Sequence, residues 1–105
     1  MATLRLFIDT HDKANKSFPA SLTPEQFEPV FEQYEAACRE EGVILLRVHL
    51  GYGDGRAFCL TMAPDADAVR RAHARIGLPF DSITEVATAS PADTFFRRQA
   101  ATATA

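Results

Sequence analysis

The fold is decided by residues 4–11, LRLFIDTH, in which apolar side chains recur at every second position. Such alternation is typical of a β-strand that has one buried face and one more polar face. It places the two leucines and Ile8 on one face, and Phe7 and Asp9 on the other. Because the segment ends on Asp9 and His11, it predicts either a first strand with a polar end or one edge of a metal site.

Length and composition limit the class of protein. The 105 residues, 47% of them hydrophobic, suffice for one domain with one core and are too few for two. A net charge of −3 offers no basic patch for nucleic acid or an anionic membrane. No signal peptide opens the chain and no apolar run nears the roughly 20 residues that span a bilayer, so we expect a cytoplasmic protein. Cys38 and Cys59 match no zinc or redox spacing, and no disulfide scaffold is expected.

Five further elements are predicted from hydrophobic periodicity and from their end signals. They are a helix between Thr23 and Gly42, a strand at residues 43–50, a strand at residues 56–62, a helix between Pro64 and Gly77, and a strand at residues 82–88. Residues 12–22 form a long loop of the kind that often covers a site. We expect residues 1–89 to form the domain, and residues 90–105 to form a partly disordered C-terminal tail.

The order of these elements, βαββαβ, predicts a ferredoxin-like α+β sandwich, an antiparallel sheet with two helices on one face. In the usual strand order 4-1-3-2 the first strand is central and runs parallel to the second. The ends of these two strands then share one end of the sheet with the end of the second helix. That end should collect two carboxylates and all three histidines of the chain: Asp9, His11, His49, His73 and Asp81.

Each of these side chains also fits an ordinary structural role. His73 lies on the apolar stripe of its helix, where a buried histidine with one satisfied nitrogen is common. His11 and His49 fit exposed positions, and Asp9 fits an acceptor of backbone hydrogen bonds. Their convergence favours a metal site, because neutral imidazoles with a carboxylate suit nickel, zinc or copper.

Several motifs of the chain belong together. They are Asp9-x-His11, Glu41-Gly42-Val43, Phe58-Cys59-Leu60, Ala66-Asp67-Ala68-Val69-Arg70-Arg71-x-His73, and Gly77-Leu78-Pro79-x-Asp81-x-Ile83-x-Glu85-Val86. Over residues 4–88 the chain resembles a domain-of-unknown-function family of small ferredoxin-like proteins, whose best-known member is a cytoplasmic nickel-binding homodimer. The resemblance implies nickel binding, homodimerisation and no established catalytic activity.

The matching positions carry over Asp9, His11 and His73 as implied metal ligands, with Glu85 as a further candidate. His49 stands where members of the family tend to place a tryptophan, so it is either an added ligand or a smaller ring in the same position. The implied cofactor is nickel, and the ligand types also suit zinc or copper. Binding should weaken below about pH 6, because each ligand histidine must lose its proton.

Three functions fit these observations. The first is storage, buffering or sensing of a divalent metal. The second is a small dimeric enzyme of the α+β barrel type, such as a monooxygenase or isomerase, or a module that binds a small molecule in an apolar pocket. In the enzyme, Asp9 would orient His73 as the proton acceptor, beside a pocket lined by Phe7, Phe31 and Phe58. The third is a structural or regulatory module, and the fold alone does not decide among them.

The sheet face opposite the helices is the expected homodimer interface. The predicted alternation assigns Phe7, Cys59 and Arg47 to it. An uncovered apolar patch of this kind seldom stays exposed, so we expect a second copy to cover it.

Overall fold

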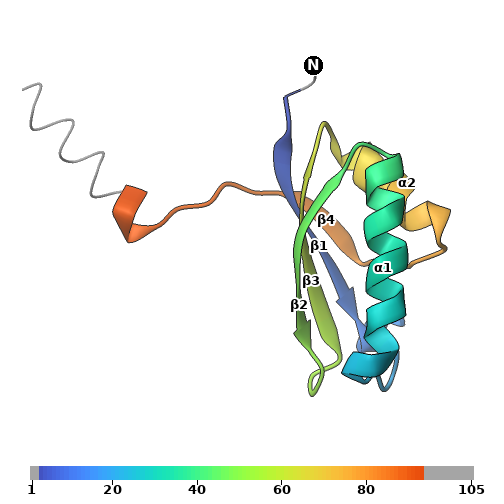
Figure 1. The fold of residues 1–105 in the computed structure, drawn as a ribbon. Helices are drawn as coiled ribbons and strands as arrows, with labels where there is room; N and C mark the ends of the chain where they lie inside the picture. The colour runs from blue at the N-terminus through green and yellow to red at the C-terminus, as the bar shows by residue number, and fades with distance from the viewer. Residues whose placement is uncertain (1–2, 94–105) are drawn as a thin grey trace, which may run out of the picture.

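A computed structural model describes residues 3–93 of the chain (Figure 1). Its elements are β1 (Arg5–Asp12), a 3-10 helix η1 (Lys13–Asn15), α1 (Pro24–Glu40), β2 (Ile44–Gly51), β3 (Arg56–Ala63), α2 (Ala66–Arg75) and β4 (Ser82–Glu85). The predicted order of helices and strands is confirmed, although β4 is shorter than predicted and η1 was not predicted. The predicted tail lies outside the described residues from residue 94 onward.

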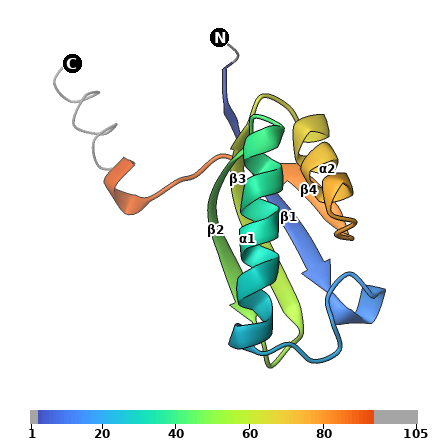
Figure 2. The ribbon, with the colours of Figure 1, turned by 45° about the vertical axis from the view of Figure 1, so that its right-hand side comes forward.

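The four strands form one antiparallel sheet in the order β2-β3-β1-β4, which is the predicted order 4-1-3-2 read from the other edge. Both α-helices cover the same face of the sheet and lie beside each other (Figures 1 and 2). The ferredoxin-like α+β sandwich is therefore confirmed. Within residues 3–93, neither helix is long and apolar enough to cross a bilayer.

Helix α1 begins at a capping box formed by Thr23 and Gln26. The Thr23 hydroxyl accepts a hydrogen bond from the backbone N–H of Gln26, whose side-chain oxygen accepts one from the N–H of Thr23. Two N–H groups that the first turn cannot use are thereby satisfied. The helix ends before Gly42, whose φ of +72° is a left-handed conformation that glycine adopts without steric cost.

The core lies between the helices and the face of β1 that carries Phe7 and Asp9. Phe7 is 2% exposed and Cys59 of β3 is 4% exposed, whereas Leu6 and Ile8 on the opposite face are only half-buried. The assignment of Phe7 and Cys59 to the open face was therefore wrong. Alternation showed which residues of β1 share a face, but the choice of the covered face depends on how the helices pack.

Strand β2 contains a register shift that its sequence does not predict. Its pairing with β3 shifts register between Leu45 and Arg47, as in a β-bulge, so the alternation changes phase there. Leu45 and Val48 both pack against the core as a result. His49 pairs with Phe58 of β3 and is exposed on the open face.

Candidate metal centre

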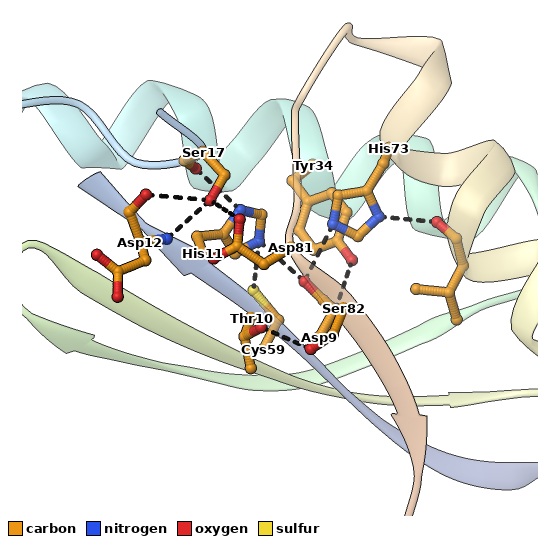
Figure 3. Close-up of polar contacts among 11 residues, drawn as sticks. Asp9, Thr10, His11, Asp12, Ser17, Tyr34, Cys59, His73, Asp81 and Ser82 are labelled. Atoms are coloured by element: carbon orange, nitrogen blue, oxygen red, sulfur yellow. Dashed lines mark hydrogen bonds and ion pairs between the residues drawn. The ribbon is translucent and has the colours of Figure 1, made fainter. Parts of the chain in front are cut away.

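Two elements bring three ionisable side chains together in the core. Asp9 and His11 are two residues apart on β1 and so point to the same, helix-covered face. His73 reaches them from the last turn of α2 (Figure 3). Each offers one ligand atom, and these atoms all lie within 4.8 Å of one another. The exposed fractions are 0% for Asp9, 4% for His11 and 1% for His73, so the cluster is shielded from bulk water.

Both imidazoles contact the same carboxylate oxygen. The Nε2 atom of His11 lies 2.9 Å from Asp9 Oδ2, and the Nε2 atom of His73 lies 3.0 Å from it. The other oxygen, Oδ1, accepts a long hydrogen bond of 3.4 Å from the hydroxyl of Tyr34 on α1. Asp9 is thus the centre of the cluster and holds the two rings against each other, with centroids 5.5 Å apart.

Backbone carbonyl groups fix the orientation of both rings. The Nδ1 atom of His11 lies 3.2 Å from the carbonyl oxygen of Ser17, and that of His73 lies 2.8 Å from the carbonyl oxygen of Val69. A carbonyl oxygen can only accept, so each Nδ1 carries a proton and donates it. Each Nε2 is then the nitrogen presented to Asp9. Metal-binding histidines are typically held in this way, with one nitrogen anchored and the other free to coordinate.

The electrostatics of the cluster favour a charged pair when no metal is bound. Burial alone would raise the pKa of Asp9, but hydrogen bonds from His11 and His73 outweigh it and lower that pKa below its ordinary value. Burial likewise would lower the pKa of His11, but the hydrogen bond to Asp9 and the charge of Asp9 raise it. Asp9 is therefore ionised at neutral pH, and His11 holds its proton more firmly than a free imidazole.

The loop after β1 is folded back over His11. The Ser17 hydroxyl accepts a hydrogen bond from the backbone N–H of Asp12 and donates one to the carboxylate of Asp81. Asn15 also donates to Asp81. These bonds, that from Ser17 first, lower the pKa of Asp81. Asp81, which topology placed at this end of the sheet, is exposed and anchors the loop that carries the Ser17 carbonyl.

The structure does not bring His49 and Glu85 to this cluster. His49 lies at the expected end of the sheet, but after the bulge in β2 its side chain is exposed on the opposite face. Glu85 of β4 pairs with Phe7, which lies two residues before Asp9 on β1. Its carboxylate forms an exposed ion pair of 3.0 Å with Arg5. Neither side chain therefore lies beside Asp9, His11 and His73, the three residues that the structure groups together.

Two neighbours of the cluster were not predicted. Tyr34 occupies the apolar stripe of α1, and its ring centroid lies 4.7 Å from that of His73. The sequence offers one indication of this role: a tyrosine on a buried helix face has a hydroxyl group, which usually has a hydrogen-bond partner. The sulfur of Cys59 lies 3.7 Å from His11 Nε2. Burial raises the pKa of this thiol, so it stays protonated and is a poorer metal ligand than the imidazoles.

An apolar cavity adjoins the cluster, but its walls differ from the predicted ones. Phe31 and His11 line it. Phe7 is buried in the core beneath the helices, and Phe58 lies on the open face of the sheet, so neither lines the cavity. His73 is not a wall residue either. The imidazole beside the cavity is therefore that of His11.

The fold and this site define a small ferredoxin-like α+β protein with a buried cluster of two histidines and one carboxylate. The chain belongs to the SCO4226-like nickel responsive protein family, whose family model matches residues 7–86. It is similar to the crystal structure of SCO4226 from Streptomyces coelicolor A3(2), with a TM-score of 0.69 and 27% sequence identity. That similarity covers 81% of this chain and 99% of the other. No curated protein matches the chain.

Proposed function

We propose that this protein binds a divalent transition metal, nickel in the first place, through Asp9, His11 and His73, and that it stores, buffers or senses that metal. The observation that carries the proposal is the approach of two Nε2 atoms to one carboxylate oxygen, at 2.9 and 3.0 Å. Imidazole nitrogen with carboxylate oxygen is a ligand set that suits nickel, zinc and copper. The name of the family supports nickel as the first choice.

Binding must exchange protons for the metal. Each Nε2 faces Asp9, and each Nδ1 already donates to a carbonyl group. A metal held by both Nε2 atoms requires these nitrogens to be deprotonated, so uptake releases protons. The bonds from Nδ1 to Ser17 and Val69 keep the rings in place meanwhile. A protonated His11 stabilises the negative charge of Asp9. A bound metal would supply that positive charge instead.

The pH range of binding follows from the same contact. The pKa of His11 is raised above its ordinary value of 6.5 by Asp9. Protons therefore compete with the metal up to a higher pH than they would at a free histidine. As the solution is acidified, nickel affinity should begin to fall while the pH is still above 6.5. With unperturbed histidines it would fall only below about pH 6.

The homodimer is part of the proposal, with a corrected surface. The open face of the sheet carries half-buried Leu6, Ile8, Phe58 and Leu60 in the isolated chain. Such a contiguous apolar surface favours a self-complementary contact between two copies. We also place the protein in the cytoplasm, because Cys38 and Cys59 are both free thiols, as in a reducing compartment.

The acid–base alternative is not favoured in its predicted form. It required His73 to accept a proton from a substrate in the apolar cavity. His73 is 1% exposed, and its two nitrogens face Asp9 and the Val69 carbonyl oxygen. No substrate atom can reach it without displacing one of these contacts.

Calorimetric titration with Ni²⁺ tests the proposal in protein purified without a histidine tag. His11→Ala and His73→Ala should each weaken binding by at least about 100-fold, the upper range for loss of an outer-sphere partner. His49→Ala is the matched control, because it removes the third histidine of the chain from an exposed site. Circular dichroism checks that each variant folds, and His73→Gln replaces His73→Ala if it does not. Equal affinity in all variants would discard the assignment.

A further inference from the structure

A cavity of about 130 Å³ lies between α1, the loop after β1 and the ends of β2 and β3. From α1 it is lined by Phe27, Val30 and Phe31, and the loop adds Phe18. Its walls are almost entirely carbon, and the imidazole of His11 forms part of them. The cavity is open to solvent on one side and is larger than one water molecule, so a small molecule could enter it.

Hydrogen bonds and packing hold the loop after β1 in place over the cavity. Ser17 is anchored to Asp12 and Asp81 by hydrogen bonds, and Phe18, the next residue, is 7% exposed. At the other wall Phe31 is 37% exposed, which is unusual for a phenylalanine and marks where the cavity meets solvent. The cavity thus has fixed walls and an apolar edge through which a molecule can enter.

The chemistry of the walls selects the occupant. An engineered cavity of about 150 Å³ lined by apolar side chains stays dry and binds benzene or xenon. The present cavity has a similar volume and a similarly apolar lining, although it opens to solvent at one edge. A charged or strongly polar molecule would find no partner in it, because the two nitrogens of His11 already contact Ser17 and Asp9.

We propose that this cavity is a binding site for a compact apolar molecule about the size of one aromatic ring. The site does not depend on metal binding at the neighbouring cluster. His11 is the wall that the two share, so occupation of the cavity should be visible at its imidazole. His49, on the other face of the sheet, should not respond.

Nuclear magnetic resonance with benzene as the probe tests this in untagged, metal-free protein. We expect saturable shifts of the His11 imidazole and of residues along the cavity, with the His49 imidazole unchanged. Val30→Phe should weaken benzene binding by about tenfold or more, because the added ring occupies the same space. Val86→Phe is the matched control, since Val86 is also half-buried but lies beyond β4, away from the cavity.

A crystal of the wild-type protein under xenon pressure gives a second readout that needs no variant. Xenon density between Val30 and His11 would support the proposal even if Val30→Phe failed to fold. Three results would overturn it: shifts that do not saturate, equal binding by Val30→Phe and the wild type, or a crystal in which a side chain of a second copy fills the cavity.

Discussion

The two faces of the sheet are built from the same strands and hold different chemistry. On the covered face, alternate residues of β1 deliver Asp9 and His11 to a closed core, where α2 adds His73. On the open face, His49 of β2 stands in solvent among half-buried apolar side chains. The difference shows that an imidazole becomes a candidate ligand here through a covering helix and a shared carboxylate. Position at one end of the sheet is not enough.

The largest expected effect comes from removing the centre of the covered cluster. Asp9→Ala removes the carboxylate that both imidazoles contact and leaves the two rings buried without that partner. Loss of one partner of a buried charged pair costs about 3–5 kcal/mol, and we expect a loss of this size in the free energy of unfolding by urea. Glu85→Ala is the control, because its exposed ion pair with Arg5 should contribute less than about 1 kcal/mol. Similar losses in both variants would contradict the contrast between buried and exposed sites.

The open face should respond to a charge without affecting the cluster. Leu60 pairs with Ile8 on this face, so Leu60→Asp should prevent association of two copies. Light scattering after size-exclusion chromatography should then give a monomer that still binds nickel with wild-type stoichiometry. Ala36→Asp, on the exposed side of α1, should stay dimeric. A monomeric wild-type protein would remove the homodimer from the proposal.

The cluster on the covered face should make the stability of the metal-free protein depend on pH. The pKa of His11 is raised in the folded state, so its contribution to stability is complete below 6.5 and is lost as the pH rises through the folded-state value. The pKa of Asp9 is lowered, so its contribution is present above 3.8 and is lost as the pH falls through the folded-state value. Melting temperatures measured across pH should therefore be highest between 3.8 and 6.5 as far as this pair is concerned.

Two variants separate that dependence from the rest of the molecule. Asp9→Asn should flatten the decline above pH 6.5, since the carboxylate that raises the pKa of His11 is gone. His49→Ala should leave it unchanged. Saturating nickel should oppose the decline, because metal affinity increases as the histidines lose their protons. An unaltered decline in Asp9→Asn would show that another group causes it.

The smallest effect is expected at Tyr34. Tyr34→Phe removes the hydroxyl that donates the long hydrogen bond to Asp9 Oδ1 and keeps the ring that packs beside His73. A loss of about 0.5–1.5 kcal/mol in the free energy of unfolding is expected. Chemical denaturation measures it, and a loss as large as that of Asp9→Ala would mean that Tyr34 does more than orient the carboxylate.

Much of the fold was predictable because its signals are local. The capping box at Thr23 and the glycine after α1 mark the ends of that helix, and the order of elements gives the sheet topology. The meeting of β1 and α2 follows from that topology. These predictions needed only hydrophobic periodicity, end signals and the usual connections of a ferredoxin-like fold.

The remaining features depend on tertiary packing. Alternation in β1 cannot say which face the helices cover, so Phe7 was placed on the wrong one. The bulge before Arg47 brings both Leu45 and Val48 to the core, and a bulge leaves little trace in a sequence of apolar residues. His49 directly follows Val48 and so points to the open face, although it lies at the predicted end of the sheet. The cavity beside His11 depends on how the loop after β1 folds back, which periodicity does not describe.

The most direct test of the metal centre is a crystal of untagged protein soaked in nickel, with diffraction recorded on both sides of the nickel absorption edge. The proposal predicts one anomalous peak per chain in the core, within bonding distance of Asp9, His11 and His73, and none at His49. A peak at His49 with none in the buried cluster, or no peak at all in crystals saturated with nickel, would contradict it.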